Sequence, residues 1–175
     1  MSRCGDAERE EATESCCAGQ HRGVAECPAC GRRGKRVDRI TPEHLLREDR
    51  VEELQDRPYY FCATLPCDMV YFSDGGEQTF SKADLKVRVG LKETEDPVPV
   101  CYCFDYTEKM IFDEIAGAGR TAIPERIRAE VLAGICECEI KNPQGTCCLG
   151  NVGRAVKRAK ALTRKAVAQI QGGYG

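Results

Sequence analysis

Thirteen of the 175 residues are cysteines, and this feature limits what the chain can fold into more than any other. A small secreted protein would pair so many thiols as disulfides, but the number is odd and residues 1–8 show no apolar signal-peptide core. In a reducing compartment thiols stay free and serve as ligands for soft or borderline metal ions. The sequence therefore predicts a cytoplasmic protein whose fold depends on metal–sulfur bonds.

Composition excludes several classes of function. The net charge is −2, so a global basic field for nucleic acid is absent and no specific nucleic-acid partner is expected. No apolar run approaches the roughly 20 residues that a membrane span needs. The sequence also lacks a phosphate-binding glycine loop, a nucleophile elbow and a His–carboxylate pair with useful spacing. We expect no enzyme of organic substrates, and at most a one-electron reduction of a metal ion.

Changes in composition and the positions of proline and glycine divide the chain into segments. The first is polar and acid-rich and has almost no large apolar side chains, which predicts a disordered arm. Its Cys4, Cys16 and Cys17 are either incidental thiols or a means of capturing a soft metal ion. The predicted segments are the disordered arm 1–23, a zinc-binding unit 24–92, a polar linker 93–98, a second cysteine-rich unit 99–150 and a basic C-terminal helix 151–175.

Two cysteine pairs lie in the first unit. Cys27-Pro28-Ala29-Cys30 has the form of a zinc knuckle, in which two thiolates face one ion while Gly31 permits the turn. Cys62 and Cys67 form a wider loop with the same chemistry. Four thiolates suit a closed, tetrahedral, structural zinc site, whereas a catalytic zinc keeps an open position and would use a ligand such as His44. The structural site is the favoured interpretation.

Local patterns in the first unit predict a mixed fold. Residues 59–62 and 69–72 are rich in aromatic and β-branched side chains and are predicted strands, and residues 85–89 alternate like a further strand. Thr41, as a cap, and Pro42, at the first helical position, predict a short helix.

The second unit carries six cysteines around two predicted helices. Thr107 caps the first helix, at 108–116, and the second follows at 124–132. A helix–turn–helix arrangement brings the ends of the unit together, so four of the thiolates can meet. Such a set suits zinc or a [2Fe–2S] cluster, and spacing alone does not separate them. The six cysteines are Cys101, Cys103, Cys136, Cys138, Cys147 and Cys148.

Two resemblances to known families rest on these motifs. Val100-Cys101-Tyr102-Cys103, the two helices and Cys136 resemble the bacterioferritin-associated-ferredoxin-type [2Fe–2S] fold. That fold has Cys-x-x-Cys in its second half, where this chain has Cys136-Glu137-Cys138. The second resemblance accounts for this difference. Residues 136–138 and 142–148, together with the upstream cysteine pairs, resemble the N-terminal domain of CopZ-type copper metallochaperones. This second similarity covers about residues 26–150.

The CopZ resemblance implies a Zn²⁺ site in the first unit and a [2Fe–2S] cluster in the second. The expected α+β fold is a small zinc-stapled β/α ribbon-like unit followed by a helix–turn–helix cluster unit. Cys136 and Cys147 are left over, as neighbours that could replace a cluster ligand or bind a transferred ion. Matched by motif, the zinc ligands are Cys27, Cys30, Cys62 and Cys67, and the cluster ligands are Cys101, Cys103, Cys138 and Cys148.

The resemblance also implies a metallochaperone and electron-transfer function. The protein is expected to handle copper, mercury or another soft metal, to reduce Cu(II), and to hold Cu⁺ transiently. A CopZ-type chaperone ends in a heavy-metal domain with a Met-x-Cys-x-x-Cys loop, which residues 151–175 do not contain. Delivery to a metal-transporting ATPase or to a separate metal-binding protein is therefore expected.

A structural two-zinc adaptor that binds a protein or nucleic acid is the alternative. It is favoured by the basic residues of 151–175 and by Arg32, Arg33, Lys35 and Arg36.

Overall fold

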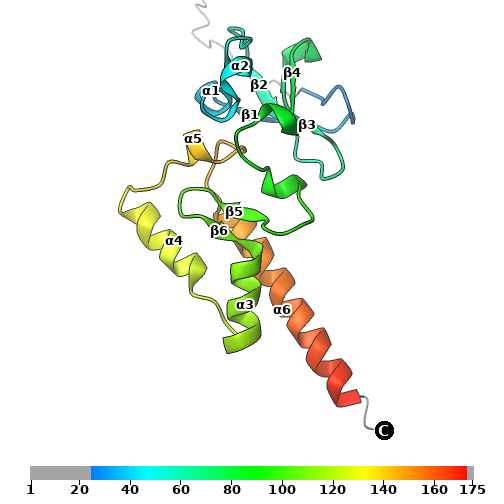
Figure 1. The fold of residues 1–175 in the computed structure, drawn as a ribbon, viewed down its shortest axis with the longest axis vertical. Helices are drawn as coiled ribbons and strands as arrows, with labels where there is room; N and C mark the ends of the chain where they lie inside the picture. The colour runs from blue at the N-terminus through cyan, green and yellow to red at the C-terminus, as the bar shows by residue number, and fades with distance from the viewer. Residues whose placement is uncertain (1–24, 173–175) are drawn as a thin grey trace, which may run out of the picture.

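The computed structural model describes residues 25–172. Figure 1 shows two groups of elements, with the strands β1–β4 at one end of the molecule and the longer helices at the other. The predicted disordered arm, with Cys4, Cys16 and Cys17, lies outside the described residues. Within residues 25–172, no helix has both the length and the apolar character needed to cross a membrane.

A four-stranded antiparallel sheet forms the first group. Its aromatic residues alternate between two faces, because successive side chains of a strand point in opposite directions. Tyr59 and Phe61 enter one core with Leu46 and Leu85, whereas Tyr60 enters a second core that contains cysteines. The predicted strands at 59–62 and 69–72 are confirmed. In the order β1-β2-β3-β4, the strands are β1 (Lys35–Val37), β2 (Tyr59–Phe61), β3 (Met69–Ser73) and β4 (Thr79–Ser81).

Two short helices, α1 (Ile40–Leu45) and α2 (Glu48–Val51), accompany this sheet. The prediction that Thr41 caps the first helix was wrong: the N-cap is Arg39, and Thr41 is buried inside the first turn. Its hydroxyl donates a hydrogen bond to the Glu139 carbonyl at 2.7 Å. Thr41 therefore links the first group to the second instead of capping the start of a helix.

The strand predicted at 85–89 is also absent from the described fold. Residues 85–89 instead connect two short 3₁₀ helices, η2 (Lys82–Asp84) and η3 (Gly90–Lys92). Within this connection Leu85 makes one isolated β-bridge, to Leu46. Leu85 and Val89 are both buried in the core of the sheet. The alternating pattern thus reflects the burial of these two side chains, not pairing along a strand.

The second group is mainly helical. Thr107 accepts a hydrogen bond from the Met110 amide, as predicted for a cap, and the chain leaves the first long helix through Gly119. The core is built from aliphatic side chains such as Ile111, Ile127 and Val152. Together the groups confirm the α+β class. The elements are β5 (Pro99–Cys101), β6 (Tyr106–Thr107), α3 (Glu108–Ala118), α4 (Ile123–Leu132), α5 (Cys138–Lys141) and α6 (Leu149–Gly172).

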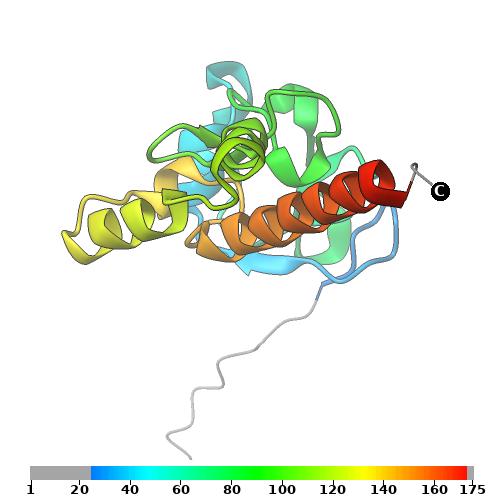
Figure 2. The same cartoon turned by 90° about the horizontal axis from the view of Figure 1, so that it is seen from below.

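The long helix α6 starts two residues before the predicted position. Val152, Ala155 and Ala159 recur at helical spacing and are buried against α3 and α4. Farther along, Leu162 is exposed. Figures 1 and 2 show that α6 continues past the end of α3, so its last turns extend from the body of the protein.

Polar contacts join the two groups at the segment that follows α5. The Tyr71 hydroxyl, on β3, donates to the Pro143 carbonyl at 2.8 Å, and burial raises the pKa of Tyr71 well above its usual value. Lys35 Nζ donates to Thr146 Oγ1 at 2.8 Å. The segment 142–146 is therefore seated on the sheet of the first group.

Gly90, in η3, provides the sharpest test of this packing. A Cβ at Gly90 would lie 1.8 Å from the Pro99 carbonyl oxygen, so a side chain forces η3 and β5 apart. We expect Gly90→Ala to lower the free energy of unfolding by about 3 kcal/mol. Urea unfolding followed by circular dichroism measures the change.

The matched control is Gly117→Ala on α3, where an added Cβ meets nothing within 4 Å. We expect it to raise the free energy of unfolding by up to ~1 kcal/mol, because alanine favours helix over glycine. Equal effects of the two substitutions would contradict the close approach of η3 and β5.

Candidate metal centres

The first centre is a group of four cysteines on one face of the four-stranded sheet. The sulfur atoms of Cys27, Cys30, Cys62 and Cys67 all lie within 4.8 Å of one another. Cys62 follows the end of β2 and Cys67 comes two residues before β3, while Cys27 and Cys30 lie in a tight turn. In that turn the Gly31 amide donates to the Cys27 carbonyl at 2.8 Å, and Gly31 has φ of 67°. The structure thus brings together the four predicted zinc ligands.

The sulfur–sulfur distances fit a zinc ion. Cys27 Sγ lies 3.9 Å from Cys67 Sγ, and Cys30 Sγ lies 3.7 Å from Cys62 Sγ. A tetrahedron with Zn–S bonds of about 2.3 Å has edges of about 3.8 Å. His44 is exposed on α1 and is not one of the four clustered residues. The chain therefore has a closed zinc-binding site of four cysteines.

Burial and hydrogen bonding set the protonation of these thiols. Burial raises the pKa of Cys27 to about 12 and also raises the pKa of Cys67. A hydrogen bond with the Thr64 hydroxyl, 3.5 Å away, lowers the pKa of Cys30 to about 6. Desolvated thiolates without a cation are costly, so bound zinc stabilises the fold by offsetting their charge.

A buried lysine at the end of η3 forms hydrogen bonds with the loop that contains Cys67. Lys92, in η3, is only 4% exposed, and its Nζ donates to the Thr64 carbonyl at 2.9 Å and to the Cys67 carbonyl at 2.8 Å. The neighbouring Glu93 carboxylate pairs instead with Arg88 and Lys82. A buried ammonium needs hydrogen-bond partners, and the Thr64 and Cys67 carbonyls supply two of them. Sequence reasoning missed Lys92 because nothing in its neighbours marks it as buried.

The second centre lies where β5, α5 and α6 meet. Cys101 ends β5, Cys103 follows in the next turn, Cys138 starts α5, and Cys148 immediately precedes α6. Cys103 Sγ lies 3.8 Å from Cys138 Sγ, and the side chains of Cys101 and Cys148 are close enough for each to shift the pKa of the other. The four residues matched to the cluster therefore form two close pairs.

The four sulfur atoms of these two pairs do not form a single compact group. Within residues 25–172, the first centre is the only group in which three or more candidate ligand atoms lie within 4.8 Å of one another. The second set is accordingly wider than a site for a single tetrahedral ion. Cys101 and Cys148 are buried, whereas Cys103 and Cys138 are partly exposed at the edge.

The local environment shifts the pKa values of the thiols in this set in opposite directions. The hydrogen bond from the Cys148 thiol lowers the pKa of Cys101 to about 7, and the same bond raises the pKa of Cys148. Burial raises the pKa of Cys138 to about 12. The Glu137 amide donates to Cys103 Sγ at 3.3 Å.

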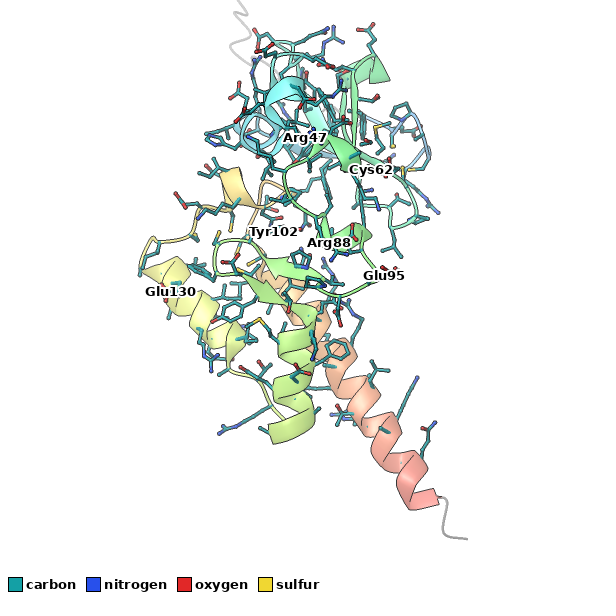
Figure 3. All side chains as sticks on the ribbon, viewed as in Figure 1. Arg47, Cys62, Arg88, Glu95, Tyr102 and Glu130 are labelled. Carbon is teal, nitrogen blue, oxygen red and sulfur yellow. The ribbon has the colours of Figure 1, made fainter. Side chains whose placement is uncertain are left out.

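The loop between the first two cysteines of this set also contacts η3. The Tyr102 hydroxyl accepts a hydrogen bond from the Gly90 amide at 2.8 Å and donates to the Arg88 carbonyl at 3.0 Å. Figure 3 shows Tyr102 and Arg88 between the part that contains Cys62 and the helices below. Through Gly90 and Lys92, one short helix touches both centres. Nothing in the sequence indicates this role of Tyr102 except its place between two cysteines.

The two remaining cysteines of this region are not in either set. Cys136 is half-buried and Cys147 is exposed, and both line a cavity of about 540 Å³ beside Cys138.

The chain is similar to known metal-binding proteins. Residues 24–86 match the family zf_CopZ, described as a zinc binding domain. Over 155 residues the chain is 32% identical to the copper chaperone CopZ of Archaeoglobus fulgidus, covering 85% of this chain and 72% of that protein. The X-ray structure of the Archaeoglobus fulgidus CopZ N-terminal domain matches with a TM-score of 0.60 and 34% identity, covering 74% of this chain and 95% of that one. The resemblance inferred from the cysteine motifs is confirmed.

Removal of one zinc ligand tests the first centre. We expect Cys62→Ser to lower zinc affinity at least about 100-fold, because a hydroxyl replaces a thiolate in a closed four-sulfur site. Zinc per chain, measured by mass spectrometry after dialysis against a chelator, reports the loss. Cys136→Ser, outside this site, is the control and should keep one zinc per chain; loss of zinc from both variants would contradict the assignment.

Lys92 gives a second test of the same centre. We expect Lys92→Met to lower the free energy of unfolding by about 2 to 3 kcal/mol, because two buried carbonyls lose their hydrogen bonds. Urea unfolding of the zinc-loaded protein measures it. The control is Lys86→Met, since Lys86 is exposed and makes only a 3.4 Å contact with the His44 carbonyl. If both variants unfold at the same urea concentration, Lys92 does not brace the site.

Proposed function

We propose a function from one premise: the chain belongs to the CopZ family of copper chaperones. It is a metallochaperone and electron-transfer module that carries a [2Fe–2S] cluster beside its zinc, reduces Cu(II) to Cu(I) and passes the ion to a partner. The zinc stabilises the fold and takes no part in the redox chemistry, because Zn²⁺ has no accessible redox change.

The observation that carries this proposal is the paired arrangement of the second cysteine set. A binuclear cluster divides four thiolates between two irons, so its ligands need not surround one point. Cys103 with Cys138, and Cys101 with Cys148, are two such pairs. A single zinc ion would require all four sulfurs to meet, as they do in the first centre. This difference also argues against the alternative, a two-zinc adaptor.

The surrounding residues suit a redox group at this place. The Glu137 amide donates to the Cys103 sulfur, and such hydrogen bonds favour the more negative, reduced state. Val100 and Cys148 belong to the apolar core that closes the inner side. When bound, the cluster supplies a one-electron couple. Cys103 and Cys138 are partly exposed, so a cluster that they helped to hold would be open to electron transfer with Cu(II) from solvent.

The state of the thiols supports an intracellular role. All ten cysteines between residues 25 and 172 are free. Free thiols in this number persist in a reducing compartment such as the cytoplasm. We therefore place delivery there, to a metal-transporting ATPase or to a separate metal-binding protein, with copper as the favoured cargo over mercury.

The visible spectrum tests the cluster and its ligands. Anaerobically purified protein should be reddish-brown and lose its colour with dithionite. Cys103→Ser should abolish or strongly shift the absorption, because oxygen is a harder ligand than sulfur. Cys136→Ser is the matched control and should leave it largely unchanged. A colourless protein that contains only zinc would overturn the proposal, and loss of colour in Cys136→Ser but not in Cys138→Ser would reverse the ligand choice.

Copper reduction tests the activity. Mixed with Cu(II) and a Cu(I)-specific chelator, the dithionite-reduced and desalted protein should yield one Cu(I) per cluster, because the cluster gives one electron. The Cys103→Ser variant measures the background from free thiols. If the two proteins yield equal Cu(I), the reduction does not come from the cluster.

A further inference from the structure

Two cysteines that the proposed function does not use open on one cavity. Cys136 and Cys147 both line the space of about 540 Å³ between α5 and the segment that leads to α6. Cys138, matched to the cluster, lines it as well. We propose that Cys136 and Cys147 form a Cu(I)-binding site in this cavity, where the ion is held beside the cluster before transfer; this inference rests on the proposed function.

The backbone explains how residues eleven positions apart come to share the cavity. After α5 the chain reverses in a turn that is fixed by Asn142, whose side chain donates to the Thr146 carbonyl at 2.5 Å. The Gly145 amide donates to the Asn142 carbonyl at 2.8 Å, which tightens the same turn. The reversal returns the chain to the cavity, so that Cys147 lines it together with Cys136.

The vicinal cysteines have different surroundings. Cys148 is 2% exposed and packs in the core of the helical group, whereas Cys147 is exposed and lines the cavity. Cys136 and Cys138 are likewise separated by one residue, and only Cys138 contacts the Cys103 sulfur. Each neighbouring pair thus has one thiol matched to the cluster set and one that is left for the cavity, and Cys138 borders both.

The donor set selects the metal ion. Cu(I) is soft and is satisfied by two thiolates, whereas Zn²⁺ in proteins takes four ligands. The side chains of Val131 and Ile140 are apolar and line the same cavity. Binding exchanges protons only: Cu(I) replaces the protons of both thiols, two sulfur–copper bonds form, and no electron moves. The site therefore receives copper that is already reduced.

The position also permits release. Cys147 is exposed, so the thiolate of a partner protein can attack the bound ion from solvent. Copper then passes by ligand exchange, with one sulfur–copper bond forming as another breaks. A site enclosed like the zinc centre would not allow this approach.

Titration with Cu(I) under anaerobic conditions tests the site. All proteins are full-length, with the cluster assembled and with Cys4, Cys16 and Cys17 replaced by serine to remove the other unassigned thiols. Against a competing Cu(I) chelator, the parent should retain one Cu(I) per chain. Cys136→Ser/Cys147→Ser should bind at least about 100-fold more weakly, since both ligands are lost. X-ray absorption of the parent should show copper bound to two sulfurs.

The outcomes separate this inference from the proposed function. Iron, sulfide, zinc and visible absorption are measured on each sample. If the cluster is present in both proteins but Cu(I) binding is equal, the site is wrong and the proposed function stands. If the parent lacks a cluster, the proposed function fails whatever copper does. Loss of the cluster in the double variant, or a Cys136–Cys147 disulfide in place of copper binding, also overturns the site.

Discussion

The first half of this protein depends on a zinc site formed by four cysteine sulfurs that lie within 4.8 Å of one another. The sheet has four short strands, and one of its faces is covered by the second core, which consists largely of cysteine and aromatic side chains. A core of this size supplies little hydrophobic free energy, so metal binding becomes part of the folding free energy. The stacked rings of Tyr60 and Phe72, 5.7 Å apart, cover the buried thiols and link the zinc site to the sheet.

The rest of the structure depends on this anchored sheet. Tyr71 and Lys35 hold the segment 142–146, and that segment determines where Cys147 and Cys148 lie. On another side, η3 connects Lys92, which bonds the zinc loop, with Gly90, which bonds Tyr102. The sheet that carries the zinc centre therefore positions the second cysteine set through two separate groups of contacts, and none of these contacts is made by a sulfur of that set.

The two cysteine sets differ in the way that their proposed tasks require. The first is compact, mostly buried and built for one inert ion. The second is wider, has one buried pair of thiols and one partly exposed pair, and borders a cavity with two further thiols. Exposure increases from the zinc site, through the second set, to Cys147. The proposed function would use this gradient, because transfer of electrons and copper requires access from solvent, whereas a metal that stabilises the fold is best enclosed.

Four features could be predicted from the sequence: the zinc ligands, the aromatic strands, the Thr107 cap and the family. These features depend on local spacing and on side-chain alternation, which are properties of short segments. Thr41, Leu85 and Lys92 were different: their roles come from partners at Glu139, Leu46 and Cys67, which no local pattern reveals. The motif match favoured Cys138 over Cys136 and Cys148 over Cys147, and this choice of cluster ligands stays a prediction. The tertiary structure adds the surroundings of each sulfur: Cys138 lies 3.8 Å from the Cys103 sulfur, and Cys148 is buried whereas Cys147 is exposed. These surroundings depend on how α5 and α6 pack against distant segments, which no short stretch of sequence specifies.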